Sequence, residues 1–321
     1  MSSPEVRRRS HKRALWFGLL AWGASFLLAL RIGASSDPGY EIIAQLRLPR
    51  ALLASAVGMS LATAGAVLQA LFSNPLCEPY TLGISSGSAL GAVLGVTFGF
   101  PLAVGGIVGS AFGGALGFMI VLYLISMRSK QGNLPLLLAG VMLGFFGSSL
   151  VTLWTAFADP NGVQGAMFWL LGDLSRARMS GATVSAGFSL VMLLMILRNR
   201  RELDALLLGE EAALTMGVDV PRVRRRLILL CSLLIAMSVS ASGMIGFVGL
   251  VVPHFARRWV GSLHRELIPL SAIWGATALV LADSLARVVA KPYELPVGAV
   301  TAVIGAPVFA WVMLQRREFA G

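Results

Sequence analysis

Charged side chains are scarce in this sequence. Asp, Glu, Lys and Arg together make up 13% of the 321 residues, where a soluble protein has about 25%. Hydrophobic residues make up 56%, so most of the chain is expected to lie in lipid rather than in water. A transmembrane helix needs roughly 20 apolar residues, and about ten such helices would use nearly the whole length. This excludes a separate soluble catalytic domain.

The sequence also lacks the residues of a catalytic or metal site. Its two cysteines, Cys77 and Cys231, lie in different contexts and are expected to be free thiols. The three histidines, His11, His254 and His264, do not form a set with metal-ligand spacing. No G-x-x-x-x-G-K-[ST] phosphate loop and no nucleophile–base pair occurs. We therefore expect no catalytic residue, no metal site and no bound cofactor, with any ATP hydrolysis on another chain.

What the sequence does have is a series of apolar runs separated by turn residues. These runs predict an all-α polytopic membrane protein with about ten transmembrane helices in a single domain, residues 1–321. The basic stretch 1–13 is expected to be a tail in front of an uncleaved first span. The predicted spans are residues 14–32, 50–72, 81–99, 102–126, 134–157, 181–197, 226–243, 246–262, 268–288 and 296–314.

Lysine and arginine are distributed unevenly between the loops. With the N-terminus inside, 19 basic residues fall in inner segments and 7 in outer ones, which accounts for all 26. This bias follows the positive-inside rule and predicts that both termini are cytoplasmic. The basic residues form short clusters between apolar runs, so the net charge of +11 does not indicate nucleic-acid binding.

The longest predicted cytoplasmic segment is 198–226. Within it, Glu202–Gly217 can form a helix in which three leucines lie beside two glutamates, and Gly217 is placed to end that helix. A partly apolar helix on the cytoplasmic side either docks on a partner protein or lies flat on the membrane. The residues alone leave both open.

A turn rich in proline separates the second and third predicted spans. Asn74–Pro79 contains two prolines that break both helices, and Glu78 is its only formal charge. One interpretation is a rigid turn. The other is a constriction at which irregular backbone borders a transport pathway, because lipid would not tolerate such backbone.

Charges at the predicted outer side suggest an ion pair and a basic patch. Asp283 and Arg287 are four residues apart, so they can pair on one helix face. Arg47 and Arg50 flank Pro49 at the outer end of the second span. Each is an ordinary interfacial anchor, or with Arg287 they build one basic patch on the outer face.

Small residues recur in the fourth predicted span. Gly105, Gly109, Gly113 and Gly117 are spaced every four residues and would form a groove along one helix face. We expect this groove to pack closely against another helix, either within one subunit or across a dimer.

Several longer motifs resemble those of the FecCD-type permeases, which serve ABC importers of iron chelates and cobalamin. They occur in the order of that family, and the resemblance extends from about residue 40 to 315. The motifs are LRLPR at 46–50, GAVLQALF at 65–72 followed by NPL at 74–76, LGISSG at 82–87, LGEEA at 208–212, GMIGFVGLVVPH at 243–254, ELPVG at 294–298 and GAP at 305–307.

This resemblance implies a type II ABC importer permease fold with ten spans in each of two permease copies, a homodimer or a pair of paralogues. It also implies two ABC ATPase subunits, which bind ATP and Mg²⁺, and a periplasmic or lipid-anchored substrate-binding protein. The expected location is the bacterial inner membrane. The expected substrate is an iron chelate (a siderophore complex or haem) or cobalamin, moved into the cytoplasm by alternating access.

The resemblance also implies roles for particular residues. The coupling helix that contacts the ATPase would comprise Leu206, Leu207, Leu208, Gly209, Glu210, Glu211, Ala212 and Gly217. The arginines that receive the binding protein would be Arg47, Arg50 and Arg287. The cytoplasmic gate would comprise Asn74, Leu76, Asn133 and Leu134, although Gly132-Asn133-Leu134 stands where the family carries small hydroxyl residues.

The alternative function is a secondary transporter or channel driven by an ion gradient. Such a protein would need ionisable residues in the middle of its spans or paired broken helices. Asp283 is the one acidic candidate, and it lies near the end of its predicted span. A membrane-embedded enzyme is a weaker alternative, because no catalytic residues converge.

Overall fold

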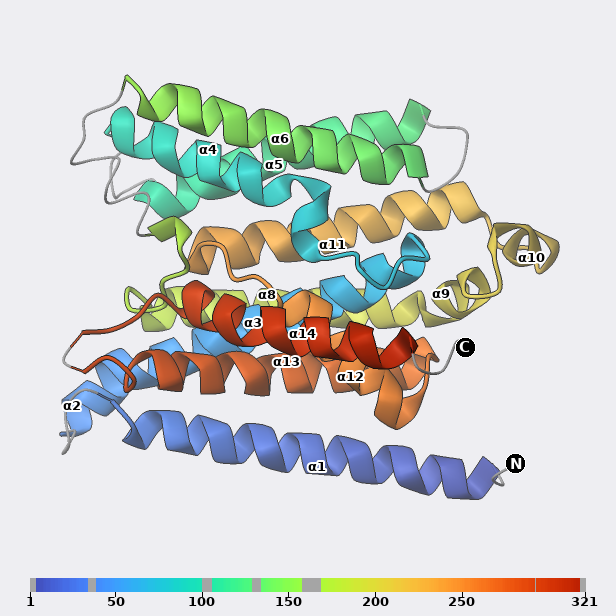
Figure 1. Ribbon diagram of the computed structural model, residues 1–321, viewed down its shortest axis with the longest axis horizontal. Coiled ribbons are helices and arrows are strands. Elements are labelled where there is room, and N and C mark those ends of the chain that lie inside the picture. The colour runs from blue at the N-terminus through green and yellow to red at the C-terminus, as the bar shows by residue number, and fades with distance from the viewer. Residues whose placement is uncertain are drawn as a thin grey trace.

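The computed structural model describes residues 4–33, 39–99, 106–128, 134–157, 169–291 and 293–317. Within these ranges the chain is a bundle of helices, most of which lie along one long axis, and it has no strand (Figure 1). The start of α1 (Pro4–Arg31) and the end of α14 (Val297–Arg317) lie at the same end of the bundle, near α10 (Glu210–Thr215). We call this the α10 end, and the opposite end, where α2 (Tyr40–Ile42) lies, the α2 end.

Each of the ten predicted spans corresponds to one helix, in the predicted order, so the all-α membrane fold is confirmed. Within the predicted tail, α1 is helical from Pro4 onward, so that part of the tail and the first predicted span form one helix. A π-helix, Ile43–Arg47, joins α2 to α3 in one continuous run. The other helices that match predicted spans are α3 (Leu48–Leu71), α4 (Ile84–Thr97), α5 (Gly106–Arg128), α6 (Leu134–Thr155), α8 (Met179–Arg198), α11 (Val220–Ser242), α12 (Val248–Val260) and α13 (His264–Ala286).

Eight of the described helices are long and apolar enough to cross a membrane. The exceptions among the ten are α4, with 14 residues, and α12, with 13. At about 1.5 Å per residue, each rises roughly 20 Å, which is less than the roughly 30 Å of a hydrocarbon core. Each follows an irregular segment, so backbone outside regular helix must cover part of the membrane depth. Such backbone is tolerated where protein surrounds it.

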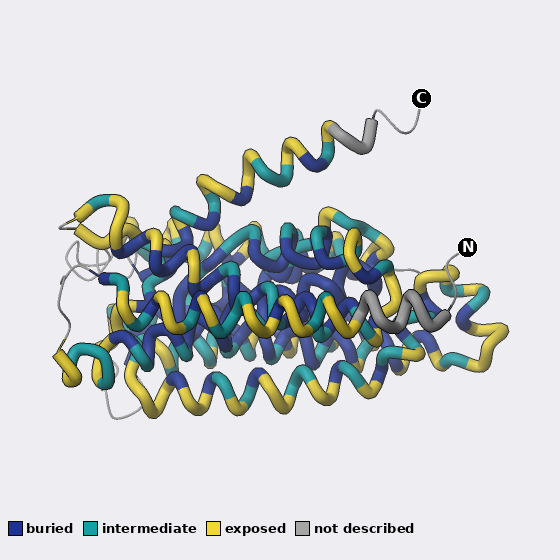
Figure 2. Tube along the Cα trace, turned by 90° about the horizontal axis from the view of Figure 1, so that it is seen from below, coloured by how far each residue is buried: buried dark blue, intermediate teal, exposed yellow. Residues whose placement is uncertain are grey.

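The α3 helix forms the centre of the bundle. All of its residues except Leu48, Leu52 and Met59 are buried. Buried residues concentrate in the middle of the molecule, whereas buried and exposed positions alternate along the outer helices (Figure 2). Small residues bring α3 close to its neighbours: a Cβ on Gly65 would overlap the carbonyl oxygen of Gly249 in α12. Close backbone approach of this kind is how helices associate in lipid.

At Gly113 and Gly117, the predicted glycine groove of α5 does not pack against a helix of the same subunit. A Cβ on Gly113 or Gly117 would meet no atom within 4 Å. It is Gly114, one position along, that lies against Gly87 and Gly91 of α4. Within the subunit, the α5 face that packs is therefore adjacent to the predicted groove, and packing of the groove across a dimer stays a prediction. Gly105 lies outside the described residues.

We expect Gly65→Val to destabilise the protein by about 3 kcal/mol, the upper end of the usual cost of overpacking, because the added atoms collide with backbone rather than with a movable side chain. Thermal unfolding in detergent and the yield of monodisperse protein measure this loss. The matched control is Gly113→Val, which places the same side chain in open space on α5. Equal stability of the two variants would contradict the close α3–α12 contact.

Candidate functional site

The segment between α8 and α11 forms two short helices rather than the single helix predicted over Glu202–Gly217. The first, α9, spans Arg200–Leu206, and the second is α10. The break falls at Gly209, whose φ of 100° favours glycine. Gly217 ends α10 as predicted: its φ is 80°, and the N–H of Val218 donates to the carbonyl of Ala213 at 3.0 Å.

The turn from α9 into α10 presents an apolar tip at the α10 end of the molecule. We call Leu207, Leu208, Leu214 and Met216 the apolar tip, with exposed fractions of 43%, 69%, 55% and 54%. Gly209, Glu211 and Gly217 are exposed beside it, and Ala212 is half-buried. Leu206 is buried and anchors the segment to the core. The predicted coupling residues therefore divide into an exposed surface and one buried anchor.

Polar contacts hold α10 and the start of α11 in place. Glu210 forms an ion pair with Arg224 of α11. Asp219 is the N-cap of α11 and accepts a hydrogen bond from the N–H of Arg222 at 3.1 Å. The segment is therefore fixed to the membrane helices while its tip is exposed, which is the arrangement that a docking element requires.

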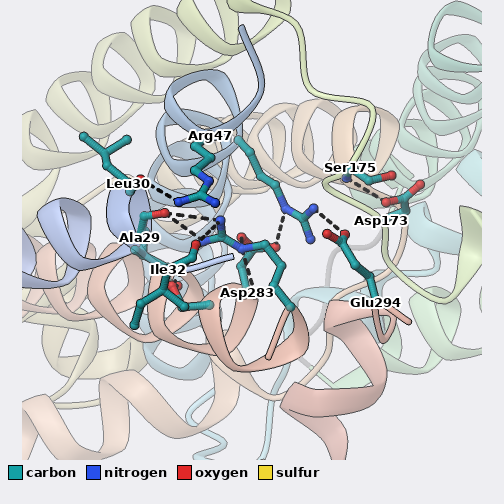
Figure 3. Close-up of polar contacts among 12 residues, drawn as sticks. Ala29, Leu30, Ile32, Arg47, Asp173, Ser175, Asp283 and Glu294 are labelled. Carbon is teal, nitrogen blue, oxygen red and sulfur yellow. Dashed lines mark hydrogen bonds and ion pairs between the residues drawn. The ribbon is translucent and has the colours of Figure 1, made fainter. Parts of the chain in front are cut away.

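At the α2 end, a cluster of buried ionic side chains joins three helices (Figure 3). Asp283 of α13 lies 2.8 Å from Arg50 Nε and 3.2 Å from Arg287 Nε. The predicted pairing of Asp283 with Arg287 is confirmed. Arg50 also contacts Glu294 at 2.6 Å, and Glu294 is the more exposed carboxylate, with a side chain 39% exposed.

Arg47 and Arg287 also contact the end of α1. Arg47 Nη1 donates to the carbonyls of Leu30 and Arg31 at 3.1 and 2.7 Å, and Arg287 donates to those of Ala29 and Ile32. The last carbonyls of a helix have no partner within the helix, and they carry partial negative charge. Arg47 and Arg287 thus cap the C-terminal end of α1.

The three arginines that the resemblance implies for docking therefore lie together, as expected of a basic patch, but they are buried. Their exposed fractions are 5%, 8% and 4% for Arg47, Arg50 and Arg287. A pocket of about 190 Å³ reaches Arg50 from the surface, and its lining includes Asp173, Ser175 and Glu294. In this conformation Arg50 lines that surface pocket.

The proline turn contacts the segment in front of α12. Glu78 accepts a hydrogen bond from the N–H of Phe247 at 2.7 Å, and the Tyr80 hydroxyl accepts one from the N–H of Ile245. Phe247 has a φ of 68°, which is rare for a residue with a bulky side chain. The irregular segments that precede the two short helices, α4 and α12, are thus hydrogen-bonded to each other. The turn is held rigidly and is also part of the irregular backbone inside the bundle.

The predicted gate residues occupy different situations. Asn74 Oδ1 accepts a hydrogen bond from the N–H of Leu76 at 2.9 Å, and the Leu76 side chain is 52% exposed. Leu134 is the first residue of α6 and is exposed. Asn133 lies outside the described residues. The gate assignment stays a prediction.

The sequence did not identify Glu294 and Asp204 as site residues, although each has a partner in the structure. Glu294 and Arg50 are 244 positions apart, and Asp204 and His264, which lie 2.8 Å apart, are separated by 60. No periodicity or spacing relates such pairs. Over the described residues, no group of three or more His, Cys, Asp and Glu could hold a metal ion, and Cys77 and Cys231 are free and buried.

Comparisons with known proteins agree with this geometry. The FecCD transport family matches residues 14–315. The hemin transport system permease protein HmuU of Yersinia pestis is 38% identical over 311 residues, covering 94% of this chain and 93% of the relative. The vitamin B12 import system permease protein BtuC of Vibrio cholerae is 40% identical over 279 residues, covering 87% and 84%.

A solved structure of a metal-chelate type ABC transporter, in an inward-facing conformation, is similar in both fold and sequence. Its TM-score is 0.87 and its identity 34%, with 95% of this chain and 99% of that chain covered. The fold is thus shared with a known ABC transporter, and the similarity to known permeases covers nearly the whole length of the chain. This chain belongs to the FecCD transport family.

Proposed function

We propose that this chain is the membrane permease subunit of an ABC importer and that it moves its substrate without covalent chemistry. The observation that carries the proposal is the apolar tip, which is held rigidly at the end of a family-typical bundle. Exposed leucine and methionine side chains at the end of a rigid segment suit a protein partner that covers them. The relatives are transport permeases, which supports a subunit that is not itself an enzyme.

The substrate class follows from the relatives. Those named above carry hemin and vitamin B12, and the similar solved structure is of the metal-chelate type. The proposed substrate is therefore a bulky metal chelate: haem, a ferric siderophore or cobalamin. Identities of 38% and 40% do not favour one of these over another.

The proposed partners are assigned to the two ends of the bundle. Two ATPase subunits, carrying ATP and Mg²⁺, would dock at the α10 end, and a substrate-binding protein would dock at the α2 end. A second permease copy would complete the pathway. Basic residues concentrate in the segments predicted to be inner, so the α10 end and both termini are assigned to the cytoplasm of a bacterium.

The site roles are proposed on the same basis. Docking of the binding protein would involve Arg50 directly, through the pocket beside Glu294, with Arg47 and Arg287 supporting the end of α1. The gate would comprise the turn with Asn74 and Leu76 together with the start of α6, Asn133 and Leu134. Leu76 and Leu134 are exposed, as lining residues of an open pathway would be.

Proteoliposomes that contain this chain, its ATPase and its binding protein test the proposal. We expect ATP-dependent accumulation of one of three labelled probes: haemin, a ferric siderophore or cyanocobalamin. The control complex carries an ATPase that binds ATP but cannot hydrolyse it. Uptake that persists in the control and collapses when an ionophore removes the ion gradient would instead identify a secondary transporter.

A further inference from the structure

The N-terminal end of α13 is capped by a side chain from another helix. The residue at the N-cap position of α13, Leu263, makes no side-chain capping hydrogen bond. Asp204 of α9 takes that role: its Oδ1 accepts a hydrogen bond from the backbone N–H of His264 at 2.8 Å. The same oxygen lies 2.8 Å from Nδ1 of the His264 ring. A carboxylate here satisfies an otherwise unpaired N–H and meets the positive end of the helix dipole.

Apolar packing surrounds this contact. The His264 side chain is 1% exposed and that of Asp204 is 26% exposed. Leu203 and Leu206 of α9 are buried in the same core cluster as Ile268 of α13. The α9 helix, which leads directly into the apolar tip, is therefore joined to α13 by both polar and apolar contacts.

The other end of α13 carries the ionic cluster at the α2 end. The helix has 23 residues and, at about 1.5 Å per residue, extends roughly 35 Å. Its single internal proline, Pro269, lies close to the start, so the length from there to Asp283 is uninterrupted. Along that length Gly275 packs directly on Gly58 of α3. Asp283 then holds Arg50 of α3, so α13 and α3 are joined at the middle and at the far end.

The α9–α10 segment has a second attachment, which is to α11. Glu210 of α10 pairs with Arg224 of α11, and α11 ends at Ser242. At that end α11 contacts the Gly172–Asp173 segment, where the N–H of Asp173 donates to the carbonyl of Ser242 at 2.8 Å. Of these two attachments, the one through Asp204 is made to α13 itself, the helix that carries Asp283 and Arg287, whereas the one through α11 ends at Asp173, which lines the pocket beside Arg50.

We propose that Asp204 and His264 are the positioning pair that transmits movement of the α9–α10 segment to α13, and through α13 to the arginine cluster at the opposite end. This rests on the proposed function, in which an ATPase moves the segment and a binding protein docks at the other end. Neither residue contacts substrate. Their role is to make the arginine cluster move together with the α9–α10 segment, on which the ATPase would dock.

The test uses the complete complex of permease, ATPase and binding protein in proteoliposomes, with haemin-loaded binding protein as the probe. The measured quantity is the ratio of ATP hydrolysis with the binding protein to that without it. Asp204→Ala is expected to lower this ratio about tenfold, in the range of typical coupling between sites. Asp204→Asn is expected to retain most of it, because an amide oxygen can still accept from the N–H of His264.

A double-variant comparison separates transmission from a local structural role. If the two residues act through one contact, the Asp204→Ala, His264→Ala double variant loses no more than Asp204→Ala alone. Arg201→Ala, an exposed position on the same helix, is the matched control and is expected to behave as wild type. Losses that multiply in the double variant would overturn the proposal.

Two further outcomes are decisive. Wild-type stimulation of ATP hydrolysis in the Asp204→Ala complex would overturn the proposal. Failure of the Asp204→Ala permease to copurify with the ATPase would also overturn it, because Asp204 would then belong to the surface that binds the ATPase. A wild-type complex that hydrolyses ATP in response to the binding protein but imports no chelate would count against the proposed substrate class alone. Failure of the inference and failure of the proposed function are thus distinguishable.

Discussion

Replacing Asp283 with alanine is expected to destabilise the protein by about 3–5 kcal/mol, the usual loss when one partner of a buried ion pair is removed. Asp283 is 1% exposed and is in contact with two guanidinium groups, those of Arg50 and Arg287. Without it, two positive charges remain buried beside each other at the junction of α3 and α13. The loss is measured by thermal or denaturant unfolding of the purified protein in detergent.

Glu294→Gln is the matched control for this prediction. Glu294 pairs with the same Arg50, but its side chain is 39% exposed, so water screens the pair and the expected loss is under about 1 kcal/mol. A similar loss in both variants would show that burial does not determine the strength of this cluster. Little loss in Asp283→Ala would contradict the contacts described for it.

The second large effect is expected at the apolar tip. Leu208→Glu combined with Glu211→Lys should reduce copurification with the ATPase and substrate uptake by at least about tenfold, because exposed anchors at the centre of an interface carry much of its binding energy. Leu208 is 69% exposed and Glu211 is exposed. The fold itself should therefore be affected by less than about 0.5 kcal/mol. Copurification, uptake and thermal unfolding are measured on the same preparations.

Glu210→Gln is the control for the tip variant. Glu210 is directed toward Arg224 rather than outward, so this change weakens an internal ion pair and leaves the exposed surface as it was. Uptake in Glu210→Gln is expected to stay within about threefold of wild type, since a single partly exposed pair contributes little. Normal ATPase assembly in the tip variant, with Glu210→Gln assembling poorly, would reverse the assignment of the docking surface.

The number and order of the membrane helices could be predicted from the sequence because they depend on local properties. An apolar run of sufficient length predicts a helix in lipid, and turn residues such as those around Pro75 and Pro79 interrupt it. The end of α10 could also be predicted from a local signal, because Gly217 adopts a backbone conformation that other residues adopt poorly. The break at Gly209 was missed, although the same kind of signal was present there.

The environment of the candidate site could not be predicted in the same way. The sequence predicted surface positions for Arg47, Arg50 and Arg287, because arginine at the end of a span usually anchors at the membrane interface. The structure buries them, since Asp283, Glu294 and the last carbonyls of α1 provide their partners. Burial of an arginine depends on acceptors from elsewhere in the chain, and spacing identifies those acceptors only within one helix, as for Asp283 and Arg287.

The sequence was thus enough to predict a polytopic helical membrane protein, the positions of its helices and the segments that carry family motifs. Hydrophobic length, turn chemistry and motif order are all properties of neighbouring residues. Three features became visible only in the folded chain: the central position of α3, the link through Glu78 between the segments before α4 and α12, and the capping of α13 by Asp204. These contacts join residues far apart in the chain, and only packing brings their side chains within hydrogen-bond distance.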